Sequence, residues 1–181
     1  MPGGRGRLPE VLISEEQIAE RVGELAAEID RDYADADELF LVGVVRGAFI
    51  FLADLARRLS IPRRVDFIAV ASYEDGERQP GEVRLIMDLR SSIEGKHVLI
   101  VDDIVDTGHT MQFLQATFTA RRPASCRACA LVRKRAAHEV PVDLDYQGFD
   151  IPDVWVVGYG LDYDDRYRTL PYIGRYDPES P

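Results

Sequence analysis

The sequence predicts an α/β fold, a mainly parallel twisted sheet flanked by helices. Along the chain, apolar runs of strand length alternate with segments whose apolar residues recur at helical spacing. The apolar runs are almost uninterrupted, which is typical of strands buried on both faces of a parallel sheet. With 181 residues, the chain is long enough for one domain with a sizeable core. We therefore expect a single domain over residues 11–181, after a disordered Gly- and Pro-rich arm at 1–10.

The first half of the chain contains a clear helix start. Ser14 and Gln17 form a capping-box pattern, and apolar residues follow at helical spacing, so a helix is expected over roughly residues 15–32. The other elements expected here are a strand at 39–45, a turn at Arg46 and Gly47, a helix at 48–59 and a strand at 65–71. Residues 72–82 are polar and contain glycine, which indicates a loop or hairpin with a returning strand at 83–89.

The second half contains an apolar run that ends abruptly at two charged residues. Residues 98–101 are predicted to form a buried strand that stops at the adjacent carboxylates Asp102 and Asp103. A helix is expected after Thr110, because apolar residues recur on one face there. The other elements expected are a strand near 126–132, a last strand at 154–159, a loop-like tail from 162 to 181, and a small hood built from the chain ends.

Two cysteines, Cys126 and Cys129, form a Cys-x-x-Cys pattern. This spacing leaves a metal-binding or redox role open. However, no second cysteine or histidine pair completes a zinc site, and the flanking residues are typical of a strand. Because residues three apart on a strand point to opposite faces, we favour two buried thiols on opposite sides of the sheet.

Charge and hydropathy argue against several classes of function. A formal net charge of -10 argues against nucleic-acid binding through a general basic surface. No apolar stretch approaches the roughly 20 residues of a membrane-spanning helix, and the N-terminus lacks the apolar segment of a secretory signal. We expect a cytoplasmic enzyme with no membrane or nucleic-acid partner. Because the net charge repels phosphorylated substrates, local cations, backbone amides and Mg²⁺ would have to bind them.

Residues 98–110 are the most informative segment of the chain. A buried strand, a tight polar turn and a helix follow one another, a layout that directs backbone N–H groups at an anion. The carboxylates of Asp102, Asp103 and Asp106 are unsuited to a phosphate, but they suit sugar hydroxyls, a metal ion or proton transfer. The segment therefore predicts a ligand with a phosphate and a sugar. An ordinary strand-to-helix turn of a doubly wound fold is the alternative.

This segment resembles the phosphoribosyl pyrophosphate (PRPP) signature of the type I phosphoribosyltransferases. The shared pattern is four apolar residues, two acidic, two apolar, and then Asp-Thr-Gly-x-Thr at 106–110. Further stretches that carry the resemblance lie at 43–49, 71–73, 133–135, 148–153, 156–163 and 167–174. The resemblance covers about residues 11–175 and is closest to the bacterial hypoxanthine and hypoxanthine-guanine members. It implies the type I phosphoribosyltransferase fold with a mobile active-site loop.

The resemblance also implies an enzyme of purine salvage. A 6-oxopurine, hypoxanthine or guanine, reacts with PRPP to give IMP or GMP and pyrophosphate. C1′ of the ribose exchanges pyrophosphate for purine N9 through an oxocarbenium-like transition state. Mg²⁺ is the implied cofactor. The family commonly forms closed oligomers, so a homodimer or homotetramer is expected.

The resemblance gives each signature residue a role. Asp106 faces purine N7 as the general base, for which a raised pKa in a partly closed pocket would be suitable; capping the following helix is the alternative. Asp102 and Asp103 bind the ribose hydroxyls and contact Mg²⁺; a solvated acidic turn is the alternative. The residues assigned to the 5′-phosphate are Thr107, Gly108, His109 and Thr110, with the His109 side chain pointing outward.

Pyrophosphate is assigned to Arg46, Gly47 and Arg168, although any single arginine is commonly just a surface charge. Lys is common in the family where Arg46 stands. The family often has a non-proline cis peptide at this turn, so the resemblance implies that the Val45–Arg46 bond is cis.

The purine is assigned to residues late in the chain. Lys134 donates to O6, and a shift of one position in the alignment would move this role to Arg133 or Arg135. Trp155 stacks on the base, with a core tryptophan as the alternative. The other assigned residues are Val156, which offers backbone groups to the purine edge, and Asp162, which meets Mg²⁺ or a polar group of the base.

Other functions stay open from the sequence. Ser72 and Tyr73 begin the loop that in the family closes over the site and excludes water, with a plain surface hairpin as the alternative. Xanthine, adenine, orotate or uracil could replace the 6-oxopurines, although Asp106 and Lys134 favour a 6-oxopurine, and the choice between guanine and hypoxanthine stays open. A regulator that keeps the PRPP fold and binds nucleotides or RNA without catalysis would be expected to carry a basic face.

Overall fold

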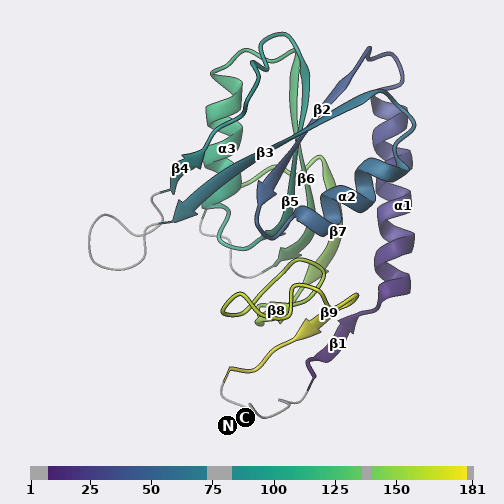
Figure 1. Cartoon of the computed structure of the whole chain (residues 1–181), viewed down its shortest axis with the longest axis vertical. Helices are drawn as coiled ribbons and strands as arrows, with labels where there is room; N and C mark the ends of the chain where they lie inside the picture. The colour runs from purple at the N-terminus through teal and green to yellow at the C-terminus, as the bar shows by residue number, and fades with distance from the viewer. Residues whose placement is uncertain (1–7, 73–82, 136–139, 179–181) are drawn as a thin grey trace.

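The computed structural model describes residues 8–72, 83–135 and 140–178, which form an α/β structure (Figure 1). Within them, the main sheet has the strand order β4-β3-β2-β5-β6-β7, and every neighbouring pair is parallel except β3 and β4. The strands are β2 (Leu39–Val45), β3 (Arg63–Ser72), β4 (Val83–Met87), β5 (His97–Val105), β6 (Ser125–Lys134) and β7 (Tyr146–Ile151). The predicted fold class is confirmed.

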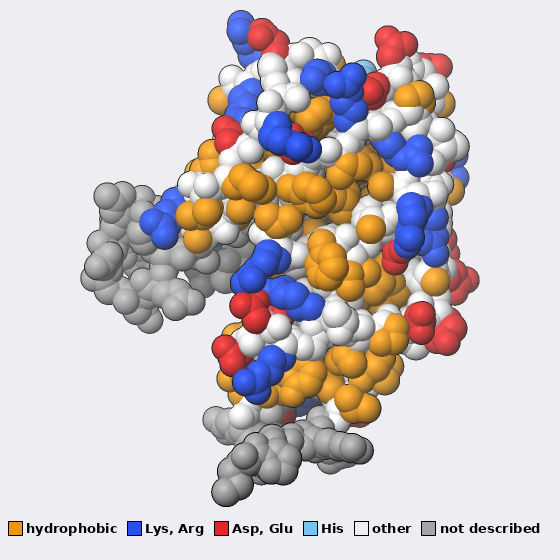
Figure 2. Space-filling model, viewed as in Figure 1, with side chains coloured by type: hydrophobic (Ala, Val, Ile, Leu, Met, Phe, Trp, Pro, Cys, Tyr) orange, Lys and Arg blue, Asp and Glu red, His pale blue; other side chains and the backbone are white. Residues whose placement is uncertain are grey.

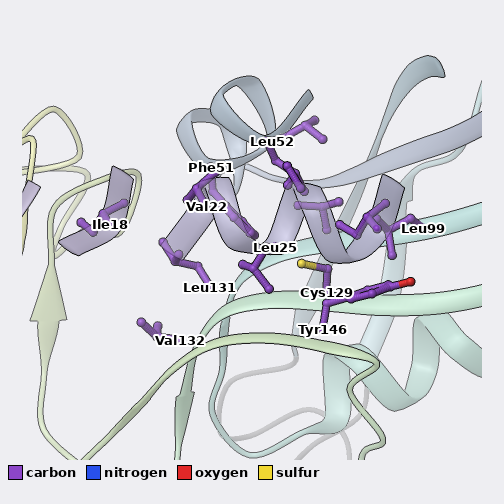
Figure 3. Close-up of a cluster of buried hydrophobic side chains, with 14 of the residues drawn as sticks. Ile18, Val22, Leu25, Phe51, Leu52, Leu99, Cys129, Leu131, Val132 and Tyr146 are labelled. Atoms are coloured by element: carbon purple, nitrogen blue, oxygen red, sulfur yellow. The ribbon is translucent and has the colours of Figure 1, made fainter. Parts of the chain in front are cut away.

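Helices cover both faces of this sheet. They are α1 (Glu15–Asp32), α2 (Phe49–Arg58) and α3 (His109–Thr119). On one face, α1 and α2 contribute residues such as Leu25 and Phe51 to a buried cluster with Leu99 of β5 (Figure 3). On the other face, Phe118 of α3 belongs to a second cluster with Ile100. Because alternate residues of β5 enter the two clusters, the strand needs apolar side chains throughout, as its uninterrupted run indicated.

The starts of α1 and α3 differ in how they are capped. The N–H of Gln17 donates to the Ser14 hydroxyl at 3.3 Å, and the Ser14 N–H donates to the Gln17 side chain at 2.9 Å, so the predicted capping box is confirmed. At α3 the N-cap residue is Gly108. The alternative that Asp106 caps this helix is therefore wrong.

Two strand predictions in the main sheet need correction. β5 continues through Asp102 and Asp103 to Val105, because β6 supplies pairing partners along this whole length. β7 was not predicted, since it lies at the sheet edge, pairs only with β6 among the described strands, and has no uninterrupted apolar run.

The chain ends form the predicted hood, but its strands differ from those expected. Within 154–159 only β8 (Val156–Val157) is a strand, so the prediction of a longer last strand is wrong. The tail is not all loop, because β9 (Ile173–Arg175) pairs antiparallel with both β8 and β1 (Glu10–Ile13). These short strands form through pairing between distant segments, which local periodicity does not reveal. Residues 1–7 of the predicted arm lie outside the described residues.

The two cysteines are free thiols on opposite faces of the sheet. Cys129 belongs to the cluster under α1 and α2, whereas Cys126 packs against the cluster under α3. Burial raises the pKa of Cys126 to about 11 and also raises the pKa of Cys129, so neither is a thiolate at neutral pH. Within residues 8–72, 83–135 and 140–178, no group of three or more His, Cys, Asp or Glu residues could hold a metal ion.

None of the described helices combines the length and the apolar character that crossing a membrane requires.

Candidate active site

A cavity of about 560 Å³ lies at the carboxyl ends of the parallel strands, where ligands of such sheets usually bind. It is bounded by the ends of β2 and β5 and by the turn that leads into α3. The predicted site residues that line it are Arg46, Gly47, Asp102, Asp103, Asp106, Thr107, Gly108, Thr110 and Asp162. Those outside its lining are His109, Lys134, Trp155, Val156 and Arg168. The predicted site residues that line the cavity thus come from three separate parts of the chain.

The turn before α3 has the shape expected of an anion site. Gly108 has a φ of +94°, and a Cβ atom there would lie 2.8 Å from the carbonyl oxygen of Val140. Only glycine meets both conditions. The first N–H groups of α3 follow directly, and they lack carbonyl partners within the helix. His109 opens α3 and is half-buried.

The turn after β2 packs tightly against β5. The Val45–Arg46 peptide bond is cis, as the family resemblance implied. A Cβ atom on Gly47 would lie 1.8 Å from Oδ2 of Asp103, so any side chain at this position would displace the carboxylate. Gly47 therefore allows the turn after β2 to lie directly against the end of β5 at the cavity.

Asp102 and Asp103 are buried, with 5% and 8% of their surfaces exposed, so the alternative of a solvated acidic turn is wrong. Burial raises the pKa of the Asp102 carboxyl well above its usual range, and the adjacent charge of Asp103 adds to this. Burial also raises the pKa of Asp103. Two neighbouring buried carboxylates are costly without a partner, so a cation or a pair of hydroxyl donors would stabilise their ionised forms.

Asp106 forms an ion pair with Lys134. Nζ of Lys134 lies 2.8 Å from Oδ2 of Asp106 and 3.2 Å from Oδ1 of Asp153. Burial acts to lower the pKa of Lys134, but hydrogen bonds to the two carboxylates outweigh it, and the pKa is raised. Asp153 was not predicted as a site residue, although it closes the 148–153 stretch.

Trp155 is 60% exposed, so the alternative of a core tryptophan is wrong. Its ring meets Tyr163 edge-on at a centroid distance of 6.0 Å, and Nζ of Lys134 lies 5.8 Å from its ring centroid. The next residue, Val156, is buried in β8. Trp155 therefore presents an accessible aromatic surface beside Lys134, although neither lines the cavity.

Arg46 and Arg168 are joined by an acidic residue that was not predicted. Asp165 accepts from Nη2 of Arg46, with Oδ1 at 2.8 Å, and from Nη2 of Arg168 at 2.9 Å. Arg168 also contacts Oδ1 of Asp162 at 2.8 Å and donates to the carbonyl of Gly160 at 2.8 Å. The i,i+3 spacing of Asp165 and Arg168 was the available signal.

Ser72 is the last residue of β3, and Tyr73 lies outside the described residues. The predicted lid loop is therefore described only at its first residue.

Residues 12–164 match the phosphoribosyl transferase domain family. A hypoxanthine-guanine phosphoribosyltransferase of Mycobacterium avium is 47% identical over 178 residues, covering 96% of this chain and 88% of that protein. A crystal structure of a Bacillus anthracis hypoxanthine-guanine phosphoribosyltransferase with HEPES in its active site has a TM-score of 0.89 at 38% identity, covering 94% of this chain and 100% of that chain. The Trypanosoma cruzi hypoxanthine phosphoribosyltransferase in complex with the product IMP has a TM-score of 0.89 at 43% identity, covering 97% and 99%.

Proposed function

The chain belongs to the phosphoribosyl transferase family, and on that premise we propose that it transfers the 5-phosphoribosyl group of PRPP to N9 of hypoxanthine or guanine. The products are IMP or GMP and pyrophosphate, which is the chemistry of purine salvage. The observation that carries the proposal is the meeting of an anion-binding turn, two buried carboxylates and the Asp106–Lys134 pair around one end of the sheet.

Asp106 and Lys134 act on the purine. The carboxylate of Asp106 accepts a proton at N7 as N9 attacks C1′, and the ammonium of Lys134 donates to O6. Because Lys134 also contacts Asp153 at 3.2 Å, it stays anchored while Asp106 changes partner. A 6-amino purine would present a donor to this ammonium, so the site would reject it.

The other predicted residues bind the rest of the substrates. Asp102 and Asp103 accept hydrogen bonds from the ribose hydroxyls, and the 107–110 turn binds the 5′-phosphate. The exposed ring of Trp155 stacks on the purine, beside backbone groups of Val156. Arg46, Gly47 and Arg168 bind pyrophosphate, with guanidinium groups that suit its oxygens.

The family's reaction depends on a metal, and we propose Mg²⁺. The carboxylates of Asp102 and Asp103 are hard oxygen donors, and Mg²⁺ typically takes one or two such ligands together with substrate phosphates. Both carboxylate oxygens of Asp162 already have partners, Arg168 and the Asp165 amide, so Asp162 would contact Mg²⁺ through water. When bound, Mg²⁺ neutralises charge on the leaving pyrophosphate.

Further expectations concern the enzyme as a whole. Apolar side chains gather across the middle of the face shown in Figure 2, and exposed apolar residues include Phe49, Val65 and Ile86. Such a surface supports a homodimer or homotetramer. A cytoplasmic location stays a prediction.

A substrate panel tests the proposal. The protein is incubated with PRPP, Mg²⁺ and hypoxanthine, guanine, xanthine or adenine, and nucleotide formation is followed. We expect IMP and GMP, with adenine at least about 100-fold poorer in kcat/KM. If no 6-oxopurine gives a product while RNA binds tightly, the non-catalytic regulator would be the better account.

A further inference from the structure

We propose that Asp165 is a built-in competitor of pyrophosphate, holding Arg46 and Arg168 together in the free enzyme and giving way when the pyrophosphate group binds. This inference rests on the proposed function, which assigns both arginines to pyrophosphate. We call the contacts of Asp165 with Arg46 and Arg168 the Asp165 bridge.

The Asp165 bridge uses the atoms that a pyrophosphate would need. Nη2 of Arg46 contacts both carboxylate oxygens of Asp165, at 2.8 and 3.0 Å. Nη2 of Arg168 contacts Oδ1 at 2.9 Å. These three residues, with Val45 and Phe49, line an open hollow of about 450 Å³ beside the main cavity. The carboxylate thus lies where an anion between the two guanidinium groups would lie.

The two arginines are not held equally. Arg168 is anchored independently of Asp165, by the Gly160 carbonyl and by Asp162, and its side chain is only 18% exposed. The Arg46 side chain is 70% exposed, and Asp165 is its partner in the ion pairs of the described residues. Removing the Asp165 carboxylate would therefore release Arg46 toward a ligand while leaving Arg168 in place.

The contacts are weak enough to be exchanged. The Asp165 side chain is 59% exposed, and ion pairs between exposed groups are screened by water. The hydrogen bond from Arg168 and then that from Arg46 lower the pKa of Asp165, so its carboxyl is ionised at neutral pH. A pyrophosphate carries more charge than one carboxylate, so it can displace Asp165 from both arginines.

Asp165→Asn removes the charge and keeps the backbone. Asp165 has a φ of +58°, a conformation that asparagine adopts more readily than most residues. The matched control is Asp164→Asn, which removes the same charge one position away. The Asp164 side chain is 78% exposed and pairs at 3.8 Å with Arg166, which lies outside the bridge.

Calorimetric titration of the full chain with inorganic pyrophosphate and Mg²⁺ tests the proposal. We expect Asp165→Asn to bind pyrophosphate about three- to tenfold more tightly than Asp164→Asn, with a matching decrease in the inhibition constant of pyrophosphate. Equal affinity of the two variants, or weaker binding by Asp165→Asn, would overturn the inference while leaving the proposed function intact. If the wild-type protein bound no pyrophosphate and formed no nucleotide, both would fail.

Discussion

Nζ of Lys134 lies 2.8 Å from Oδ2 of Asp106, so the base and the O6 donor proposed for the reaction are paired with each other in the free protein. The pairing keeps a largely buried ammonium compensated until the purine arrives. In the free protein it also places the two groups that would contact N7 and O6 next to each other.

Replacement of Asp106 by asparagine should remove the base and keep the shape of the side chain. We expect kcat for IMP formation to fall by about 10²- to 10⁴-fold, the usual contribution of a general base. The midpoint of urea unfolding should change little, because Asp106 is 45% exposed and Lys134 keeps its contact with Asp153 at 3.2 Å. Steady-state kinetics and urea titration measure the two effects, and turnover at the wild-type rate would exclude Asp106 as the base.

Replacement of Lys134 by methionine should weaken recognition of 6-oxopurines. The variant leaves Asp106 and Asp153 without their shared cation, but their side chains are 45% and 56% exposed, so we expect a loss of at most about 1 kcal/mol in the free energy of unfolding. The ratio of kcat/KM for hypoxanthine over adenine should also fall, because the O6 donor is gone.

The control for this variant is Lys96→Met, which removes the other lysine of the chain. Nζ of Lys96 lies 4.9 Å from the ring centroid of Phe40, away from the cavity lining. It should leave the purine preference unchanged. If both variants shifted the preference equally, Lys134 would have no specific role.

Replacement of Gly47 by alanine should disrupt the cavity. The new Cβ would overlap the Asp103 carboxylate, so the turn after β2 or the end of β5 must shift. We expect KM for PRPP to rise at least tenfold, with a stability loss of about 1–3 kcal/mol from overpacking. Kinetics at varied PRPP and thermal unfolding measure both.

Gly23 offers a matched glycine in the same chain. It lies inside α1, and a Cβ there would meet nothing within 4 Å. Gly23→Ala should raise the free energy of unfolding by about 0.5–1 kcal/mol and leave kinetics unchanged. Unaltered kinetics in Gly47→Ala as well would show that the tight contact has no functional consequence.

Replacement of Asp102 by asparagine should stabilise the fold near neutral pH and impair activity. Burial raises the pKa of Asp102 in the folded protein above its ordinary value of 3.8, so between these two values the folded protein binds more protons than the unfolded chain. The free energy of unfolding of the wild type therefore falls as pH rises from 3.8 through the folded pKa. This fall should be smaller in the variant, as urea titrations across this range would show.

Asp88 supplies a control of opposite sign. Hydrogen bonds from Arg121, at 2.7 and 3.0 Å, lower the pKa of Asp88, so its contribution to stability is present above 3.8 and is lost as pH falls through the folded pKa. Asp88→Asn should lose stability at neutral pH. If Asp102→Asn also lost stability at neutral pH, the ionised Asp102 carboxylate would be stabilised by its surroundings in the free protein rather than destabilised by burial.

The local sequence was sufficient to predict those elements whose residue pattern is contained in the element itself. The capping box at Ser14 and the apolar run of β2 predicted α1 and β2, because both elements depend on near neighbours. The hood strands β1, β8 and β9 depend on pairing between the two chain ends, so no local period marks them.

The same distinction applies to the site. The turn at 107–110 could be predicted because its ligand-binding residues are consecutive in the sequence. The Asp106–Lys134 contact follows from the parallel register of β5 and β6, which places Val105 opposite Arg133. The sequence does not show that these two strands are neighbours, so the contact could not be predicted from it. Asp165 was missed because its partner Arg46 lies on a different loop.

A crystal structure of the protein with IMP would test the central claim most directly. We predict the 5′-phosphate on the amides of residues 107–110, the ribose hydroxyls on Asp102 and Asp103, and O6 within hydrogen-bond reach of Lys134. A nucleotide bound outside this cavity, with the 107–110 turn in its free state and Lys134 still paired only with Asp106 and Asp153, would contradict the account.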